Sequence, residues 1–267
     1  MSEIRLKLHP RQSLAFLSKA TEILYGGAAG GGKSHLMRVV AIMMCMAVAG
    51  IQVYIFRRVS DDLRKNHLEG PSGLRAMLSP LMVSGHCKFN DSKGIFEFWN
   101  GAKIYLCHCQ HEKDMYKYQG AEIHVLLMDE LTLFTEQIYK FLRGRVRLGG
   151  LAVPSEYTGK LPLILCGSNP GNIGHVWVKK TFVDFAPPME ITRTPAAEGG
   201  MLRQYIPAKL ADNPTLAAND PDMILLISQR RMSRISTRII RSTNMRNTSS
   251  TVSASVRKIS WWVTIIL

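Results

Sequence analysis

The sequence predicts an α/β fold of three layers, in which a mainly parallel sheet lies between helices on both faces. Short, continuous apolar runs at residues 125–128 and 163–166 are typical of strands that are buried on both faces. A strand, a glycine-rich loop, a helix and a second strand follow one another between residues 23 and 56, which are the dimensions of a βαβ unit. Strands and helices that alternate in this way favour a parallel sheet with helices on both faces.

Each expected element is marked by its own pattern. Gly50 ends the second helix as a C-terminal glycine does, and Gly70-Pro71 interrupts the polar stretch after the second strand. Asn100-Gly101 is a strong signal for a β-hairpin. The expected elements are, in order, a helix at 4–20, a strand at 23–25, a helix at 34–49, a strand at 52–56, a mainly helical stretch at 60–82, hairpin strands at 95–99 and 103–107, a strand at 125–128, a helix at 136–147 and a strand at 163–166.

The charge of the chain is high and uneven. The 267 residues carry a formal net charge of +14, which suggests a polyanionic partner, most simply nucleic acid. Between Met223 and Leu267 there are eight Lys and Arg residues and no Asp or Glu, so subtracting these eight from +14 leaves +6 for residues 1–222. We therefore expect a main domain at 1–222 and a basic, atypical tail at 223–267.

The sequence favours a reducing compartment and contains no membrane segment. Its five cysteines are odd in number and irregularly spaced, which does not indicate a disulfide framework. The first residues are polar, unlike a signal peptide, and the longest apolar run, 39–49, is about half the length of a bilayer span. Cys107-His108-Cys109 has no second ligand pair at zinc-finger spacing, so we expect buried strand cysteines there rather than a zinc site.

Residues 27–34 match the phosphate-binding pattern G-x-x-x-x-G-K-[ST] in full. Glycines let the backbone curl so that successive N–H groups point at phosphate oxygens, and the following helix turns its positive N-terminus towards the same anion. Lys33 would reach the β- and γ-phosphates of ATP, and the hydroxyl of Ser34 would ligate Mg²⁺. The expected nucleotide-binding residues of the loop are Gly27, Ala28, Ala29, Gly30, Gly31, Gly32, Lys33 and Ser34.

Two further polar segments follow buried strands. Asp129 and Glu130 end the strand at 125–128, where Asp129 can hold Mg²⁺ through water and Glu130 can accept a proton from the attacking water. Residues 167–170, Gly-Ser-Asn-Pro, follow the strand at 163–166. A polar side chain there either lies between the two sites and senses the γ-phosphate or belongs to a plain turn.

Other candidate residues are less specific. Gln12 precedes the loop, and its amide can bond to an adenine edge, although the sequence alone favours a surface position on a helix. An arginine can stabilise the charge of the transition state, in cis or from a neighbouring subunit. Each arginine taken alone is more simply read as a solvated surface residue. The candidates are Arg57, Arg58, Arg143, Arg145 and Arg147.

Several short segments come in a characteristic order along residues 8–222. They are His9-Pro10-Arg11-Gln12, residues 26–34, Phe56-Arg57-Arg58, Tyr118-Gln119-Gly120, Met128-Asp129-Glu130, Gly167-Ser168-Asn169-Pro170, His175-Val176-Trp177 and Asp212-Asn213-Pro214. This order resembles that of the large terminase subunits of tailed phages. The loop and the acid pair occur in many ATPases, but their combination with Tyr-Gln-Gly before the acids and Asn-Pro after the next strand is more specific.

The resemblance implies an ASCE-type P-loop ATPase, whose subunits form a homo-oligomeric ring at the portal of a procapsid in the host cytoplasm and push double-stranded DNA into the shell. It implies ATP and Mg²⁺ as cofactors, and the portal protein and the small terminase subunit as partners. Gln12 becomes an adenine contact and Ser168-Asn169 the coupling motif. The expected catalytic residues are Lys33, Glu130, Ser168 and Asn169, and the expected metal residues are Ser34 and Asp129.

One feature departs from the family pattern. Large terminases carry a second, C-terminal nuclease domain with an acidic two-metal site, yet no Asp or Glu follows Asp222. We therefore expect a motor domain without nuclease activity, whose tail is disordered or results from a frame shift near Met223. A naturally shortened motor subunit is the alternative. Two other functions stay open: a truncated remnant that only binds nucleotide, and a RecA- or helicase-like DNA-dependent ATPase.

Overall fold

The computed structural model describes residues 3–28, 30–209, 212–213 and 261–266. Within these residues, nine strands form one sheet in the order β4-β5-β6-β3-β7-β8-β2-β10-β9. The six strands from β6 to β10 are all parallel, which confirms the predicted mainly parallel sheet. They are, in spatial order, β6 (Lys103–His108), β3 (Gln52–Arg57), β7 (Val125–Met128), β8 (Leu163–Ser168), β2 (Glu22–Gly26) and β10 (Leu202–Pro207).

Antiparallel strands extend this sheet at both edges. β4 (Cys87–Asn90) and β5 (Ile95–Phe98) lie beyond β6, and β9 (Ile191–Arg193) lies beyond β10. The hairpin between β5 and β6 turns at Asn100-Gly101, as the sequence predicts, and Gly101 adopts a φ of +80° there. The strands that carry the candidate site therefore lie in the interior of the sheet.

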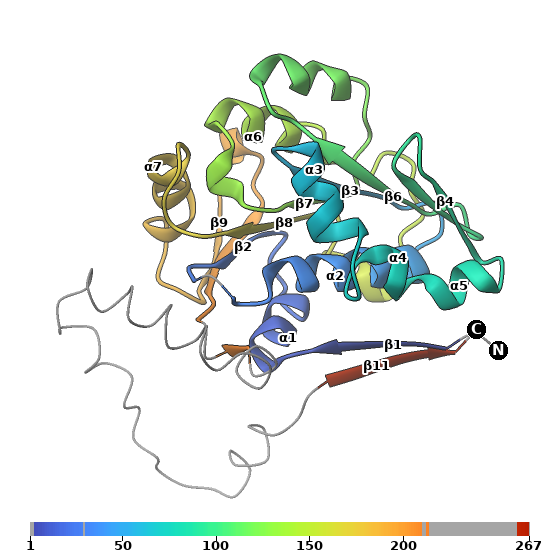
Figure 1. The fold of residues 1–267 in the computed structure, drawn as a ribbon. Coiled ribbons are helices and arrows are strands. Elements are labelled where there is room, and N and C mark those ends of the chain that lie inside the picture. The colour runs from blue at the N-terminus through green and yellow to red at the C-terminus, as the bar shows by residue number, and fades with distance from the viewer. Residues whose placement is uncertain (1–2, 29, 210–211, 214–260, 267) are drawn as a thin grey trace, which may run out of the picture.

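Helices cover both faces of the sheet (Figure 1). In this view α2 (Lys33–Ala47) lies below the sheet and α6 (Glu136–Arg143) lies above it. None of the helices that the structure describes is long and apolar enough to cross a membrane. The remaining helical segments are α1 (Pro10–Phe16), α3 (Ser60–Leu63), the π turn η1 (Arg64–Leu68), α4 (Leu74–Met77), α5 (Ser79–Val83), η2 (Glu112–Tyr118), η3 (Leu131–Leu133), η4 (Ser155–Tyr157), α7 (His175–Val178), the π turn η5 (Lys179–Val183) and η6 (Ala196–Glu198).

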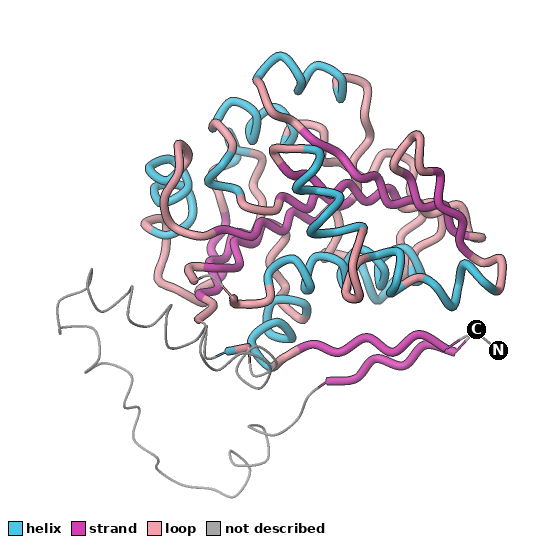
Figure 2. The backbone as a smooth tube through the Cα atoms, viewed as in Figure 1, coloured by secondary structure: helices cyan, strands magenta, loops and turns pink. Residues whose placement is uncertain are grey.

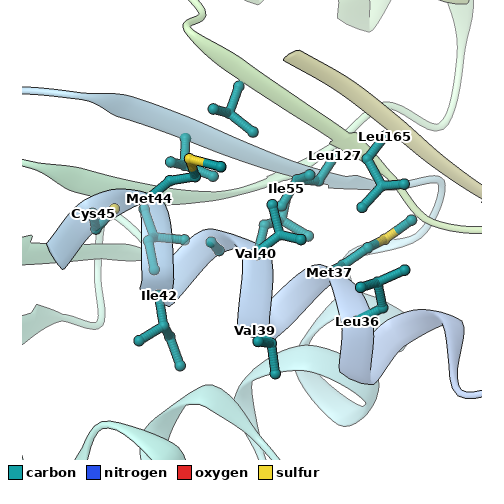
Figure 3. Close-up of a cluster of buried hydrophobic side chains, with 14 of the residues drawn as sticks. Leu36, Met37, Val39, Val40, Ile42, Met44, Cys45, Ile55, Leu127 and Leu165 are labelled. Atoms are coloured by element: carbon teal, nitrogen blue, oxygen red, sulfur yellow. The ribbon is translucent and has the colours of Figure 1, made fainter. Parts of the chain in front are cut away.

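The core consists of two apolar layers, one on each face of the sheet. Successive residues of a strand point to opposite faces, so a strand that is covered on both sides is apolar throughout. On β7, Leu127 belongs to the layer between the sheet and α2, whereas its neighbour Met128 belongs to the layer between the sheet and α6. Figure 3 shows the first of these layers, where side chains of α2 face Ile55, Leu127 and Leu165.

The N-terminal segment differs from the prediction. A single helix over residues 4–20 was expected, but β1 (Glu3–Leu8) precedes the short helix α1. Ile4, Leu6 and Leu8 are buried at every second position, which is the period of a strand. β1 pairs in antiparallel fashion with β11 (Trp261–Ile266), and the two strands lie apart from the main sheet (Figure 2). Residues 223–260 of the predicted tail lie outside the described residues.

Candidate nucleotide-binding site

Three polar segments meet at the carboxyl ends of three neighbouring strands in the middle of the sheet. β2, β8 and β7 are parallel neighbours, so the loop after β2, Ser168-Asn169 and Asp129-Glu130 all lie at their carboxyl ends. β8 stands between the strand that leads into the loop and the strand that ends in the acids. This arrangement belongs to the predicted α/β fold, in which a mainly parallel sheet lies between helices.

The glycine loop begins where the ends of two strands touch. A Cβ atom on Gly26 would lie 2.1 Å from the backbone oxygen of Ser168, so glycine is required for β2 and β8 to end side by side. The N–H of Gly27 donates to the same oxygen at 3.0 Å. Gly32, with a φ of +72°, then leads into α2. The first N–H groups of this helix have no partners within it, which suits an anion. Ala29 lies outside the described residues.

Gln12 supports the loop from α1. Its Nε2 donates to the carbonyl oxygen of Gly32 at 2.8 Å, and its Oε1 accepts from the N–H of His9 at 2.7 Å. Asn213 donates to the carbonyl oxygen of Gly30 at 2.6 Å. Gln12 is buried in this position against the backbone of the loop. Its predicted contact with adenine stays a prediction.

Lys33 is the first residue of α2, and the residue as a whole is buried. Its Nζ donates to the carbonyl oxygen of Ala28 at 3.0 Å and to Oδ1 of Asn169 at 2.7 Å. Burial lowers the pKa of Lys33, while the negative charges of Glu130 and Asp129 oppose this shift. A cation held inside the loop in this way suits the phosphates of a nucleotide.

Asp129 is fully buried next to the start of α2. Its Oδ2 accepts from the Ser34 hydroxyl at 3.1 Å, lies 2.9 Å from Nε2 of His67 and lies 3.4 Å from Nη1 of Arg57. Burial raises the pKa of Asp129, but the bond and charge of His67, the charge of Arg57 and the bond from Ser34 outweigh it and hold the pKa at about 2. Asp129 is therefore ionised at neutral pH.

Glu130 has a left-handed backbone, with φ 56° and ψ 56°. Such a conformation is uncommon for a residue other than glycine and is found most often where function requires it. Nδ2 of Asn169 donates to both carboxylate oxygens of Glu130, at 3.0 and 3.2 Å. Burial raises the pKa of Glu130, the charge of Lys33 opposes this shift, and the charge of Asp129 adds to it. A raised pKa suits a general base.

Asn169 bridges the lysine of the loop and the second acid, because its Oδ1 faces Lys33 and its Nδ2 faces Glu130. Its backbone oxygen accepts from the hydroxyls of Thr132, at 2.9 Å, and Ser168, at 3.1 Å. A cavity of about 230 Å³ borders these residues on the side of α7. Residues 167–170 are therefore more than a plain turn in this structure.

The arrangement fits a nucleotide with Mg²⁺. Ser34 and Asp129 lie in contact, and Oδ1 of Asp129 is a buried acceptor without a hydrogen-bond partner among the described residues. Mg²⁺ usually takes few protein ligands and keeps several waters and phosphate oxygens. Among the described residues, no group of three or more His, Cys, Asp or Glu side chains is placed to hold a metal ion, and this includes Cys107 and Cys109, which are both buried.

Of the five candidate arginines, the structure brings Arg57 to this site. Its guanidinium group lies beside Asp129, although the sequence does not distinguish Arg57 from its neighbours. The others contact different groups: Arg58 the carbonyl oxygen of Leu133, Arg143 the carboxylate of Glu22, Arg145 the ring of Phe141 and Arg147, through its backbone, the carbonyl oxygen of Ile123.

The comparisons with known proteins agree with this geometry. A family model described as "Phage terminase large subunit" matches residues 18–198. This chain belongs to that family. The matched region contains the loop, both acids and Ser168-Asn169, whereas Gln12 precedes it. Among curated proteins, none matches the chain.

Solved terminase structures have the same fold. The large terminase of a thermophilic bacteriophage in complex with ATP-γ-S is 17% identical, with a TM-score of 0.57 over 83% of this chain and 49% of that one. The same protein in complex with ADP is 15% identical, with a TM-score of 0.57 over 85% and 50%. A mutant ATPase domain of the large terminase of Thermus phage P74-26 is 15% identical, with a TM-score of 0.54 over 85% and 88%. The chain thus spans about half the length of the first two.

Proposed function

We propose that this terminase chain hydrolyses ATP and uses the reaction to move double-stranded DNA into a procapsid. The observation that carries the proposal is the direct contact of three strand ends, in which Asn169 joins Lys33 to Glu130. A phosphate-binding loop, a magnesium carboxylate and a base for water are the parts that phosphoryl transfer to water needs. The match to the terminase family supports the same reaction.

Each residue has a role in this proposal. The N–H groups of the loop and Lys33 would bind the phosphates of ATP, and Ser34 and Asp129 would hold Mg²⁺, the latter through water. When bound, Mg²⁺ neutralises charge on the phosphates and helps to orient the γ-phosphoryl group. Glu130 would accept the proton of the attacking water, for which its raised pKa is suited.

Asn169 would couple phosphate binding to Glu130. In this structure the side-chain amide of Asn169 accepts a hydrogen bond from Lys33 and donates one to Glu130. A γ-phosphate is a stronger partner for an ammonium group than a neutral amide is, because its bond is charge-assisted on both sides. Phosphate would therefore separate Lys33 from Asn169, and the adjoining cavity offers the amide room to turn. This is a physical basis for the expected role of Ser168-Asn169 as a coupling motif.

The proposed partners follow from the family. They are double-stranded DNA, the portal protein, the small terminase subunit and further copies of this chain in a ring on the procapsid, in the cytoplasm of the host. A net charge of +14 supports a polyanionic partner.

The proposal is tested by phosphate release from ATP with and without linear duplex DNA. We expect duplex DNA to stimulate the wild-type chain, and Lys33→Ala to lower turnover by about 100-fold or more, since a preorganised charge at the phosphates is lost. Lys93→Ala, at an exposed lysine in the turn between β4 and β5, is the control and should behave as the wild type. Full activity in Lys33→Ala would show that the site is wrongly assigned.

A further inference from the structure

His67 is a buried side chain that the proposed mechanism does not use. It is fully buried, and its Nε2 lies 2.9 Å from Oδ2 of Asp129. A carboxylate oxygen accepts hydrogen bonds, so the tautomer of His67 that carries its proton on Nε2 is the donor in this contact. The second ring nitrogen, Nδ1, has no hydrogen-bond partner among the described residues. The contact with Asp129 is thus the polar interaction that orients this ring.

The local backbone directs His67 towards the site. Residues 64–68 form a single π turn after α3, closed by the N–H of Glu69 and the carbonyl oxygen of Arg64 at 2.9 Å. Single π turns of this kind occur frequently at functional sites. Arg38, a buried residue of α2, donates to the carbonyl oxygen of Asn66, next to His67 in the turn. The turn is therefore attached to the helix that begins with Lys33 and Ser34.

His67 and Ser34 meet the same oxygen of Asp129. Oδ2 of Asp129 receives the hydroxyl of Ser34 at 3.1 Å and the imidazole of His67 at 2.9 Å, so the two donors fix the rotation of the carboxylate. The other oxygen, Oδ1, lies beside Gly167, where a Cβ atom would approach it to 3.4 Å. Without His67, the carboxylate would keep the hydroxyl of Ser34 and the more distant Arg57 as partners on this side.

We propose that His67 is a positioning residue for Mg²⁺: it holds Oδ2 of Asp129 next to the hydroxyl of Ser34 and so sets the affinity of the site for the metal. The inference rests on the proposed function, because Ser34 and Asp129 are the residues that would hold Mg²⁺. Hydrogen-bond partners of metal-binding groups typically change metal affinity by about 10- to 100-fold when they are removed.

The experiment measures binding of a fluorescent ADP analogue, mant-ADP, in magnesium chloride and in EDTA. His67→Leu keeps apolar bulk and removes the donor, whereas His67→Gln keeps an N–H at similar reach. We expect His67→Leu to weaken binding about tenfold in magnesium and not in EDTA, and His67→Gln to recover most of the loss. His124→Ala is the control, since His124 is a buried histidine that accepts from the N–H of Gln52, away from the site.

The outcomes separate this inference from the proposed function. Ser34→Ala should weaken binding in magnesium; if it does not, and the wild type binds equally in EDTA, the magnesium site itself is refuted. If Ser34→Ala behaves as expected but His67→Leu matches the wild type, or loses affinity equally in magnesium and EDTA, His67 has only a structural role. Circular dichroism verifies that each variant is folded. If His67→Leu does not fold, His67→Gln decides: magnesium-dependent binding as in the wild type is expected, and a tenfold loss despite a retained donor overturns the inference.

Discussion

Replacing Gly26 with alanine would place a methyl group where β8 already lies. The new Cβ would stand 2.1 Å from the backbone oxygen of Ser168, which is 1.3 Å short of an ordinary contact of 3.4 Å. That oxygen cannot easily move, because it accepts from the N–H of Gly27 and belongs to a strand paired on both sides. Overpacking a tight site costs about 1–3 kcal/mol, and this contact with rigid backbone belongs at the upper end.

The effect is measured by thermal unfolding. A loss of about 3 kcal/mol corresponds to a fall in Tm of about 6–12 °C for a domain of this size. ATP turnover should fall as well, because the shift of Ser168 displaces Asn169. Gly150→Ala is the matched control: its Cβ would meet no atom within 4 Å, so its Tm should stay at or slightly above that of the wild type. If Gly26→Ala has the same Tm as Gly150→Ala, the close approach of β2 and β8 is refuted.

Two further predictions concern buried acids. Burial raises the pKa of Glu130, so turnover should rise with pH around a pKa above the ordinary glutamate value of about 4.3. A pH–rate profile in which turnover has already risen at or below about pH 4.3 would argue against Glu130 as the base. Glu22 is buried between Arg143 and Arg203, and Glu22→Gln should cost about 3–5 kcal/mol in thermal unfolding, whereas the exposed Glu156→Gln should be neutral. Burial opposes ionisation of Glu22, but both arginines hold its pKa below the usual range, so the stability that it contributes is present above about pH 4.3 and lost as the pH falls through the lower, folded pKa.

The interior strands and the loop could be predicted because their causes are local. β7 begins and ends where the apolar run does, since a strand covered on both faces must be apolar at every position. The loop could be identified because its backbone requires glycine, as the φ of +72° at Gly32 illustrates. Parallel strands place their carboxyl ends at one edge, so the meeting of Asp129 with Ser34 followed from the predicted fold.

Contacts that depend on tertiary packing were not predictable in this way. His67 lies 62 positions from Asp129, and its approach requires a π turn that no residue pattern indicates. Among the arginines, only the position of β3 beside β7 singles out Arg57. The prediction of one helix over residues 4–20 is wrong, because Ile4, Leu6 and Leu8 are buried at every second position, which is the period of a strand, and the helix begins only at Pro10.

The most direct test of the central claim is a single-turnover measurement on Glu130→Gln with radiolabelled ATP. Glutamine keeps the size of Glu130 and an oxygen for Asn169, but it cannot take a proton from water. We predict that Glu130→Gln binds ATP as the wild type does and hydrolyses it at least about 100-fold more slowly in the first turnover. Hydrolysis of the bound ATP at the wild-type rate would contradict the account, because the proton of the attacking water would then go to another group.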